Sequence, residues 1–263
     1  MPRKRAKRSV VTFHDLFVMS GEYSTAEFRE KFTRQAREAA GRADLVVCVS
    51  AFTASQVAGL LGVESGRLRV IWHGVHAPST PPPPWEDREP MILHVGALQR
   101  RKNILRLVEA FEQMPAGWRL VLAGSTGYGA GEILERIERS EARARIEVTG
   151  YITDTRLQDL YRRARMLVFP SLDEGFGIPL LEAMAYGVPI VTSKGSALGE
   201  VARDAAILVD PLRVDEIAGA MTRMASDEAL RGEVVSRGLS IARRHGWQAA
   251  AHQTWQVYRE LLA

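Results

Sequence analysis

The strongest constraint on the fold is a regular alternation of short apolar runs and amphipathic segments from residue 89 onward. Aliphatic and β-branched residues dominate the runs, which are too short to be buried helices, and segments with helical spacing separate most of them. The expected strands are residues 91–95, 119–123, 146–148, 166–169, 188–192 and 207–209. Alternating βα units of this kind predict an α/β protein with a parallel, doubly wound sheet that is covered on both faces.

A proline-rich segment divides the chain, because residues 78–84 read Pro-Ser-Thr-Pro-Pro-Pro-Pro. Such a run cannot join a helix or a central strand, and it forms a semi-rigid spacer. Before it we expect strands at 10–13, 44–49 and 68–72, with helices at 25–40 and 51–61, the second capped by Ser50. The predicted organisation starts with a basic tail (1–8) and a truncated α/β domain (9–77). A linker (78–88) then leads to a Rossmann-like domain (89–246) and to a C-terminal helix (247–263) that packs back toward the first domain.

The composition narrows the classes of partner. The 35 Lys and Arg residues against 31 Asp and Glu residues leave a net charge of +4, too small to require a nucleic acid, and no nucleic-acid-binding motif is present. The sequence contains no run of 18 consecutive apolar residues, which is about the length needed to span a membrane. Cys48 is the only cysteine, which excludes an intrachain disulfide and fits a cytoplasmic location. The basic tail is either a solvated arm or a peripheral contact to the inner membrane face.

The loop after the strand at 91–95 is a candidate anion site. Gly96 allows close backbone approach, and three cations at residues 100–102 precede a helix whose N-terminus also attracts anions. In a parallel sheet this loop lies at the carboxyl edge, where ligands bind. It is therefore a candidate diphosphate cradle. The alternative is a row of solvated basic residues before a helix.

The loop after the strand at 166–169 is more informative. Glu174 lies just before the next expected helix and Glu182 about one turn inside it, and the two are separated by a Gly-Phe-Gly-Ile-Pro insert. Because helical side chains lean toward the N-terminus, both carboxylates can point toward one cleft. Glu182 is set in an apolar stretch and needs a polar partner there, which ribose hydroxyls would supply.

These motifs resemble the retaining, B-fold glycosyltransferases of family four. The resemblance rests on the loop at 170–185, on Gly-Val-Pro-Ile-Val-Thr-Ser at 187–193 and on Arg-Lys-Asn at 101–103, and it extends over nearly all of residues 90–262. Shorter matches are Tyr-Ile-Thr-Asp at 151–154, Leu-Tyr-Arg-Arg-Ala at 160–164, Glu-Val at 200–201, Phe-His-Asp-Leu at 13–16 and His-Gly-Val at 73–75. The resemblance implies the B-type fold, here with a complete C-terminal domain and a shortened N-terminal one.

The resemblance also implies a role for each candidate residue. Lys102 and Arg101 would neutralise the diphosphate of a GDP-mannose or UDP-sugar donor, while Glu174 would bind the hydroxyls of the transferred sugar. His14 would face the sugar and the acceptor across the cleft, although a structural histidine at a strand end is the alternative. The remaining expected donor contacts are Gly96, Tyr151, Ile152, Gly175, Phe176, Gly177, Ile178 and Glu182.

The expected reaction is transfer of a hexose, with retention, from the nucleotide sugar to a glycan, lipid-linked or small-molecule acceptor. No Asp-x-Asp triplet is present, so we expect neither a metal nor another cofactor, and fixed cations would stabilise the leaving diphosphate. Two alternatives remain open. The chain is either a binding module without turnover, or an enzyme completed by a second copy or a partner chain that contacts residues 10–75.

Overall fold

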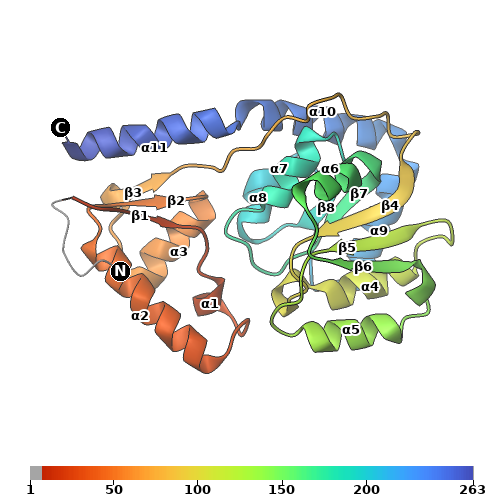
Figure 1. Ribbon diagram of the computed structural model, residues 1–263, viewed down its shortest axis with the longest axis horizontal. Helices are drawn as coiled ribbons and strands as arrows, with labels where there is room; N and C mark the ends of the chain where they lie inside the picture. Colours follow the sequence, from red (N-terminus) through yellow and green to blue (C-terminus); the bar gives the residue numbers. More distant parts are fainter. Residues whose placement is uncertain (1–7, 263) are drawn as a thin grey trace.

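The structure, a computed structural model, describes residues 8–262 and contains two parallel sheets, each with its own helices (Figure 1). The larger sheet has the order β6-β5-β4-β7-β8-β9. Its strands are β4 (Glu89–Val95), β5 (Arg119–Ala123), β6 (Ile146–Gly150), β7 (Ala164–Phe169), β8 (Ile190–Ser193) and β9 (Ile207–Val209). This order is that of a doubly wound dinucleotide-binding sheet, and it confirms the predicted α/β class.

Helices cover both faces of the larger sheet. One face packs on α4 (Ile104–Glu112), α5 (Ala130–Glu138) and α9 (Val214–Ser226), and the other on α6 (Asp154–Arg163), α7 (Ile178–Ala185), α8 (Ser196–Ala202) and α10 (Glu228–Arg244). Residues 91–94 of the central strand β4 and 166–169 of β7 are buried, as their apolar sequences require. The chain leaves β4 toward one edge of the sheet and β7 toward the other, so a crevice opens between their carboxyl ends.

The smaller sheet consists of β1 (Val10–Phe13), β2 (Leu45–Cys48) and β3 (Leu68–Val70), in that order. Helices α2 (Ala26–Arg42) and α3 (Ala51–Leu61) cover one face. The C-terminal helix α11 (Trp247–Leu262) follows α10 and lies along the other face (Figure 1), where Val257 packs against Leu45, Val47 and Ile71. The last helix of the chain therefore belongs to the core of the first domain.

The proline-rich linker is fixed to the larger domain. Arg88 is only 4% exposed, and its guanidinium donates to the carbonyls of Pro83, Tyr161, Ala164 and Tyr186. Burial, with a smaller contribution from Arg162, lowers the pKa of Arg88 to about 10. The linker thus runs along the second domain, where Arg88 holds it in place.

Two short helices were absent from the expected elements. Helix α1 (Phe17–Ser20) follows β1, and α8 follows β8. Both are too short for a clear apolar period, and Ser196 begins α8 with a positive φ of 57°. Within residues 8–262 no helix is both long and apolar enough to cross a lipid bilayer. The basic tail predicted at 1–8 lies, except for Arg8, outside the described residues.

Candidate active site

The site occupies the crevice at the carboxyl ends of β4 and β7. Gly96 follows β4 with φ of +139°, a conformation that favours glycine. A Cβ at this position would lie 3.2 Å from Lys102 Cε, so Gly96 also leaves room for the lysine side chain. Asn103 donates from Nδ2 to Pro170 O at 3.0 Å and to Pro211 O at 2.6 Å. The Arg-Lys-Asn motif therefore ties the loop after β4 to the loops after β7 and β9.

Two cations and one carboxylate meet in this crevice. Lys102 Nζ lies 2.6 Å from Glu174 Oε1, and Arg101 Nη1 lies 2.8 Å from Glu174 Oε2. All three side chains are nearly buried. Burial favours the neutral acid, but Lys102 and Arg101 outweigh it and lower the pKa of Glu174. Burial also lowers the pKa of Lys102, although Glu174 opposes this shift. The group is a preorganised ion cluster with one more positive than negative charge.

Glu182 lies in a neighbouring pocket of about 320 Å³ between α6, α7 and the segment after β3. The Tyr161 hydroxyl donates to Glu182 Oε2 at 2.8 Å. Burial raises the pKa of Glu182 and the Tyr161 hydrogen bond opposes that shift. The pocket is also lined by Gly74, Val75, His76, Asp154, Leu157, Gln158, Ile178, Tyr186 and Trp247. Its size and mixed lining suit a nucleoside.

The smaller domain closes the crevice from the opposite side. His14 follows β1, and its Nδ1 lies 3.3 Å from Nε2 of His73, with the two rings stacked. Burial, and to a lesser extent the charge of His14, lowers the pKa of His73 to about 4. Phe176 packs edge-on against His73. A Cβ on Gly175 would lie 1.9 Å from His14 O, so the Glu174 loop reaches the smaller domain only because residue 175 is glycine.

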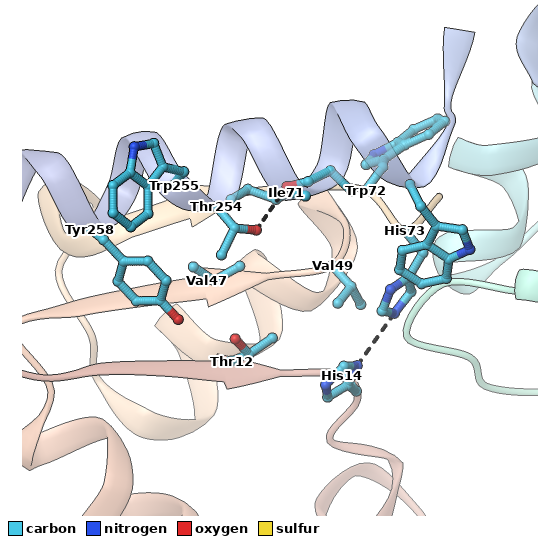
Figure 2. Close-up of a pocket in the computed structure, with 13 residues that line it drawn as sticks. Thr12, His14, Val47, Val49, Ile71, Trp72, His73, Thr254, Trp255 and Tyr258 are labelled. Atoms are coloured by element: carbon cyan, nitrogen blue, oxygen red, sulfur yellow. Dashed lines mark hydrogen bonds between the residues drawn. The ribbon is translucent and has the colours of Figure 1, made fainter. Parts of the chain in front are cut away.

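An apolar groove of about 420 Å³ opens beside His14, between the smaller sheet and α11 (Figure 2). Val47, Val49 and Ile71 form its floor, and α11 contributes Trp255 and Tyr258. Figure 2 shows His14 and His73 at one end of this groove and Trp255 and Tyr258 at the other. The groove is therefore continuous with the wall of the crevice that carries His14.

The structure brings most of the expected site residues together. Lys102, Arg101, Gly96 and Glu174 meet at the switch point, and Gly175, Phe176 and Gly177 lead from Glu174 into α7. Ile178 and Glu182 share the neighbouring pocket. Tyr151 and Ile152 do not line that pocket, and Tyr151 is 84% exposed after β6.

Sequence reasoning gave no role to His73, Tyr161 or Trp247. His73 and Tyr161 did carry a signal, because both lie in short segments that support the family resemblance. Trp247 carried none, since it reaches the pocket only through the path of α11. Within the part of the chain that the structure describes, no three His, Cys, Asp or Glu side chains are grouped so that they could hold a metal ion. Metal independence of the reaction stays a prediction.

Two family descriptions match the chain. Residues 79–239 match "Glycosyl transferases group 1", and residues 1–77 match "Glycosyltransferase Family 4". The boundary between the matches falls at the proline-rich linker.

Two curated relatives from Escherichia coli are similar over almost the whole chain. O-antigen chain mannosyltransferase B is 31% identical over 98% of this chain and 71% of its own length. Serotype-specific mannosyltransferase WbdA is 28% identical over 97% of this chain. The chain spans only 34% of the length of WbdA.

Solved structures share the fold. Sucrose-phosphate synthase from Thermosynechococcus elongatus superposes with a TM-score of 0.83 and 26% identity, over 96% of this chain and 67% of that one. Anabaena Alr3699/HepE in complex with UDP-glucose superposes with a TM-score of 0.79 and 22% identity, over 97% of this chain and 72% of that one. The two-domain arrangement around the crevice is thus shared with these proteins.

Proposed function

Because this chain belongs to the group 1 glycosyl transferases, we propose that it moves a hexose from a nucleoside-diphosphate sugar to an acceptor, with retention of configuration and without a metal. The observation that carries the proposal is the meeting of Lys102, Arg101 and Glu174 at the switch point between β4 and β7. Ligands of doubly wound sheets bind at this point.

The charges of the cluster match the needs of the reaction. Cleavage of the bond between the sugar and the phosphate leaves negative charge on the diphosphate and positive character on the sugar ring. Lys102 and Arg101 would stabilise the negative charge on the diphosphate. Fixed charges in a crevice closed to water act more strongly than they would in water. Glu174, which its two cations keep ionised, would accept hydrogen bonds from the sugar hydroxyls.

The remaining residues divide between nucleoside and acceptor. The pocket around Glu182 would hold the ribose through the carboxylate that Tyr161 orients. His14 would face the acceptor, which would enter along the apolar groove beside it. The relatives are named as mannosyltransferases, and one structural neighbour contains UDP-glucose, so GDP-mannose and UDP-glucose are the first donors to test. The proposal places the enzyme in the cytoplasm, where the basic tail is either a solvated arm or a peripheral contact to the inner membrane face.

The test is thermal unfolding with a panel of nucleotide sugars, with and without EDTA. A ligand at a hundredfold excess over its Kd stabilises the folded state by about 2.7 kcal/mol. We expect one donor to raise the melting temperature equally in both conditions. The proposal fails if no nucleotide sugar has an effect, and metal independence fails if EDTA abolishes the effect.

A second candidate, a module that binds donor but needs another chain for turnover, is favoured by the smaller sheet. Within residues 8–262, β1 pairs only with β2, so its outer edge is unpaired beside the apolar groove. We propose that residues 10–75 contact a second copy or a partner chain through this edge. Light scattering, with donor hydrolysis measured on the same sample, separates the cases. A monomer that turns over donor excludes the need for a second chain.

A further inference from the structure

One carboxylate of the larger domain reaches into the smaller one. Glu200 on α8 accepts hydrogen bonds from the backbone N–H groups of Ala51 and Phe52, each at 3.0 Å and each to a different oxygen. The indole N–H of Trp72 donates to Glu200 Oε1 at 3.1 Å. Nothing in the proposed chemistry uses Glu200, although the Glu-Val pair at 200–201 is among the motifs of the resemblance.

These contacts complete the N-terminus of α3. The first N–H groups of a helix have no partner within the helix and form its positive end. Ser50 caps the helix by accepting from the N–H of Thr53. Glu200 accepts from the two N–H groups that Ser50 does not reach. Hydrogen bonds to an ionised carboxylate are stronger than neutral ones, so this is a directional contact between the domains.

The N-terminal end of α3, which is hydrogen-bonded to Glu200, also donates hydrogen bonds to the Glu174 loop. Ser50 Oγ donates to Gly175 O at 2.6 Å, and Thr53 Oγ1 donates to the same oxygen at 2.9 Å. On the other side, the N–H of Ala197 in α8 donates to Glu174 O at 3.2 Å. The backbone of Glu174 and Gly175 is therefore held between α3 and α8, and Glu200 joins these two helices.

Trp72 extends the same contact to the histidine pair. Its indole packs edge-on against Phe176, which in turn packs edge-on against His73, the stacking partner of His14. The hydrogen bond to Glu200 fixes the indole N–H end of Trp72. Glu200 thus has contacts on both routes between the domains, through α3 to the Glu174 loop and through Trp72 to His14.

We propose that Glu200 is a positioning residue, which docks the smaller domain onto the Glu174 loop and so sets the distance between His14 and the cations of the donor site. The inference rests on the proposed glycosyl transfer, for which both sides of the crevice must be in place. Glu200 itself touches neither donor nor acceptor. Its loss would leave the donor cluster of Arg101, Lys102 and Glu174 intact and misplace the opposite wall.

The test is the substitution Glu200→Gln, with Glu233→Gln as the matched control. Glutamine keeps the volume of the side chain but lacks the charge and one acceptor oxygen, whereas Glu233 is an exposed residue of α10 that pairs with Arg237. We expect kcat to fall about 10- to 100-fold, the cost of a misplaced reacting group. Affinity for the nucleoside diphosphate should not change. Trp72→Phe removes one of the three hydrogen bonds and should give a smaller loss.

A second readout does not depend on turnover. In Glu200→Gln, hydrogen exchange should become faster at the amides of Ala51 and Phe52, which donate to Glu200, and at the amide of Ala197, which donates to Glu174 O, while exchange in α4 stays as in the wild type. Unchanged exchange at Ala197 together with unchanged kcat overturns the inference. A fall in nucleotide affinity equal to the fall in kcat also overturns it, because the donor site would then be damaged. If the wild type transfers no sugar, the proposed function fails, and the exchange of the Ala197 amide still decides the role of Glu200.

Discussion

The two domains differ in how completely each builds its own structure. The larger domain has a six-stranded sheet with helices on both faces. Its loops contain every charged group of the donor cluster. The smaller sheet has three strands, and one of its faces is covered by α11 from the end of the chain. The charged groups of the donor cluster therefore lie in one domain, although Arg101 also packs over the ring of Phe17 in the smaller domain, whereas the position of His14 depends entirely on how the domains dock.

The difference separates two kinds of substitution. Changes in the Lys102 and Glu174 cluster should damage donor chemistry wherever the smaller domain lies. A change at Glu200 should leave the donor cluster in place and move the opposite wall, and a change at Gly175, the neighbour of Glu174, should affect both sides. Variants of both kinds test this division, and the largest effect is expected within the donor cluster.

Lys102→Ala should give the largest loss. A preorganised cation next to a developing negative charge contributes roughly 2–4 kcal/mol to the stabilisation of the transition state, so kcat should fall about 30- to 1,000-fold. Lys31→Ala, at an exposed position of α2, is the matched control. Steady-state transfer assays measure the effect, and thermal unfolding checks the fold. Normal turnover in Lys102→Ala would move the phosphate site elsewhere, with Arg101 as the next candidate.

The larger domain should lose stability in mild acid because of His94. This residue is fully buried in β4, where its Nδ1–H donates to Val168 O at 3.0 Å. Burial lowers its pKa from 6.5 to about 4, while the hydrogen bond opposes that shift. Between these values the unfolded chain takes up a proton that the folded protein does not, so stability falls as the pH falls. The loss reaches at most about 3 kcal/mol at pH 4.

The matched variants are His94→Asn and His252→Asn. Asparagine retains a donor for Val168 O but does not titrate, so His94→Asn should flatten the dependence of the unfolding free energy on pH in the window between the two pKa values of His94. His252 is exposed on α11, and His252→Asn is the control for the same substitution at an exposed position. Equal slopes in all three proteins would refute the assignment to His94, and would leave His73, whose pKa is also about 4, as the alternative source.

Gly175→Ala tests the docking of the two domains. The added Cβ would lie 1.9 Å from His14 O, which requires a shift of the backbone. We expect kcat to fall about 10- to 100-fold, because the wall that carries His14 is displaced. Gly131→Ala is the control, because its Cβ meets nothing within 4 Å and the residue lies in helix α5. Equal kinetics of the two variants would mean that the close approach of the domains is unnecessary for turnover.

Tyr161→Phe should have the smallest effect. The change removes one hydrogen bond, at 2.8 Å, to Glu182. A hydrogen bond to a charged group contributes about 1.5 kcal/mol or more, so nucleoside-diphosphate affinity should fall about tenfold. Isothermal titration measures the affinity, with Tyr258→Phe as the control, because Tyr258 lines the apolar groove and not the Glu182 pocket. Unchanged affinity in Tyr161→Phe would remove the Glu182 pocket from the nucleoside site.

The sequence predicted the local structure of both domains well. Strands β1, β5 and β9 and helix α3 have the predicted bounds, since their apolar runs are short and well delimited and Ser50 caps α3 as expected. Lys102 and Glu174 were also predicted as site residues, because parallel strands bring their carboxyl ends to one edge of a sheet. Their direct contact was not predicted, since it depends on the path of both loops.

The contacts that the sequence did not predict join residues that are far apart in the chain. His14 and His73 are 59 residues apart, and Glu200 is 149 residues from Ala51. No periodic pattern encodes such contacts, because they depend on the way in which two finished domains dock. The same holds for Trp247, which α11 carries back to the pocket near Glu182. Sequence reasoning therefore predicted the donor side more completely than the acceptor side.

The most direct test of the account is titration of a nucleoside diphosphate into the wild type, Lys102→Ala and His14→Ala. The donor cluster lies wholly in the larger domain, so Lys102→Ala should weaken binding at least about tenfold, the loss of one charge-assisted contact. His14→Ala should bind like the wild type, because His14 faces the crevice from the smaller domain. Wild-type affinity in Lys102→Ala, with binding lost in His14→Ala, would contradict the assignment of the donor site to the larger domain.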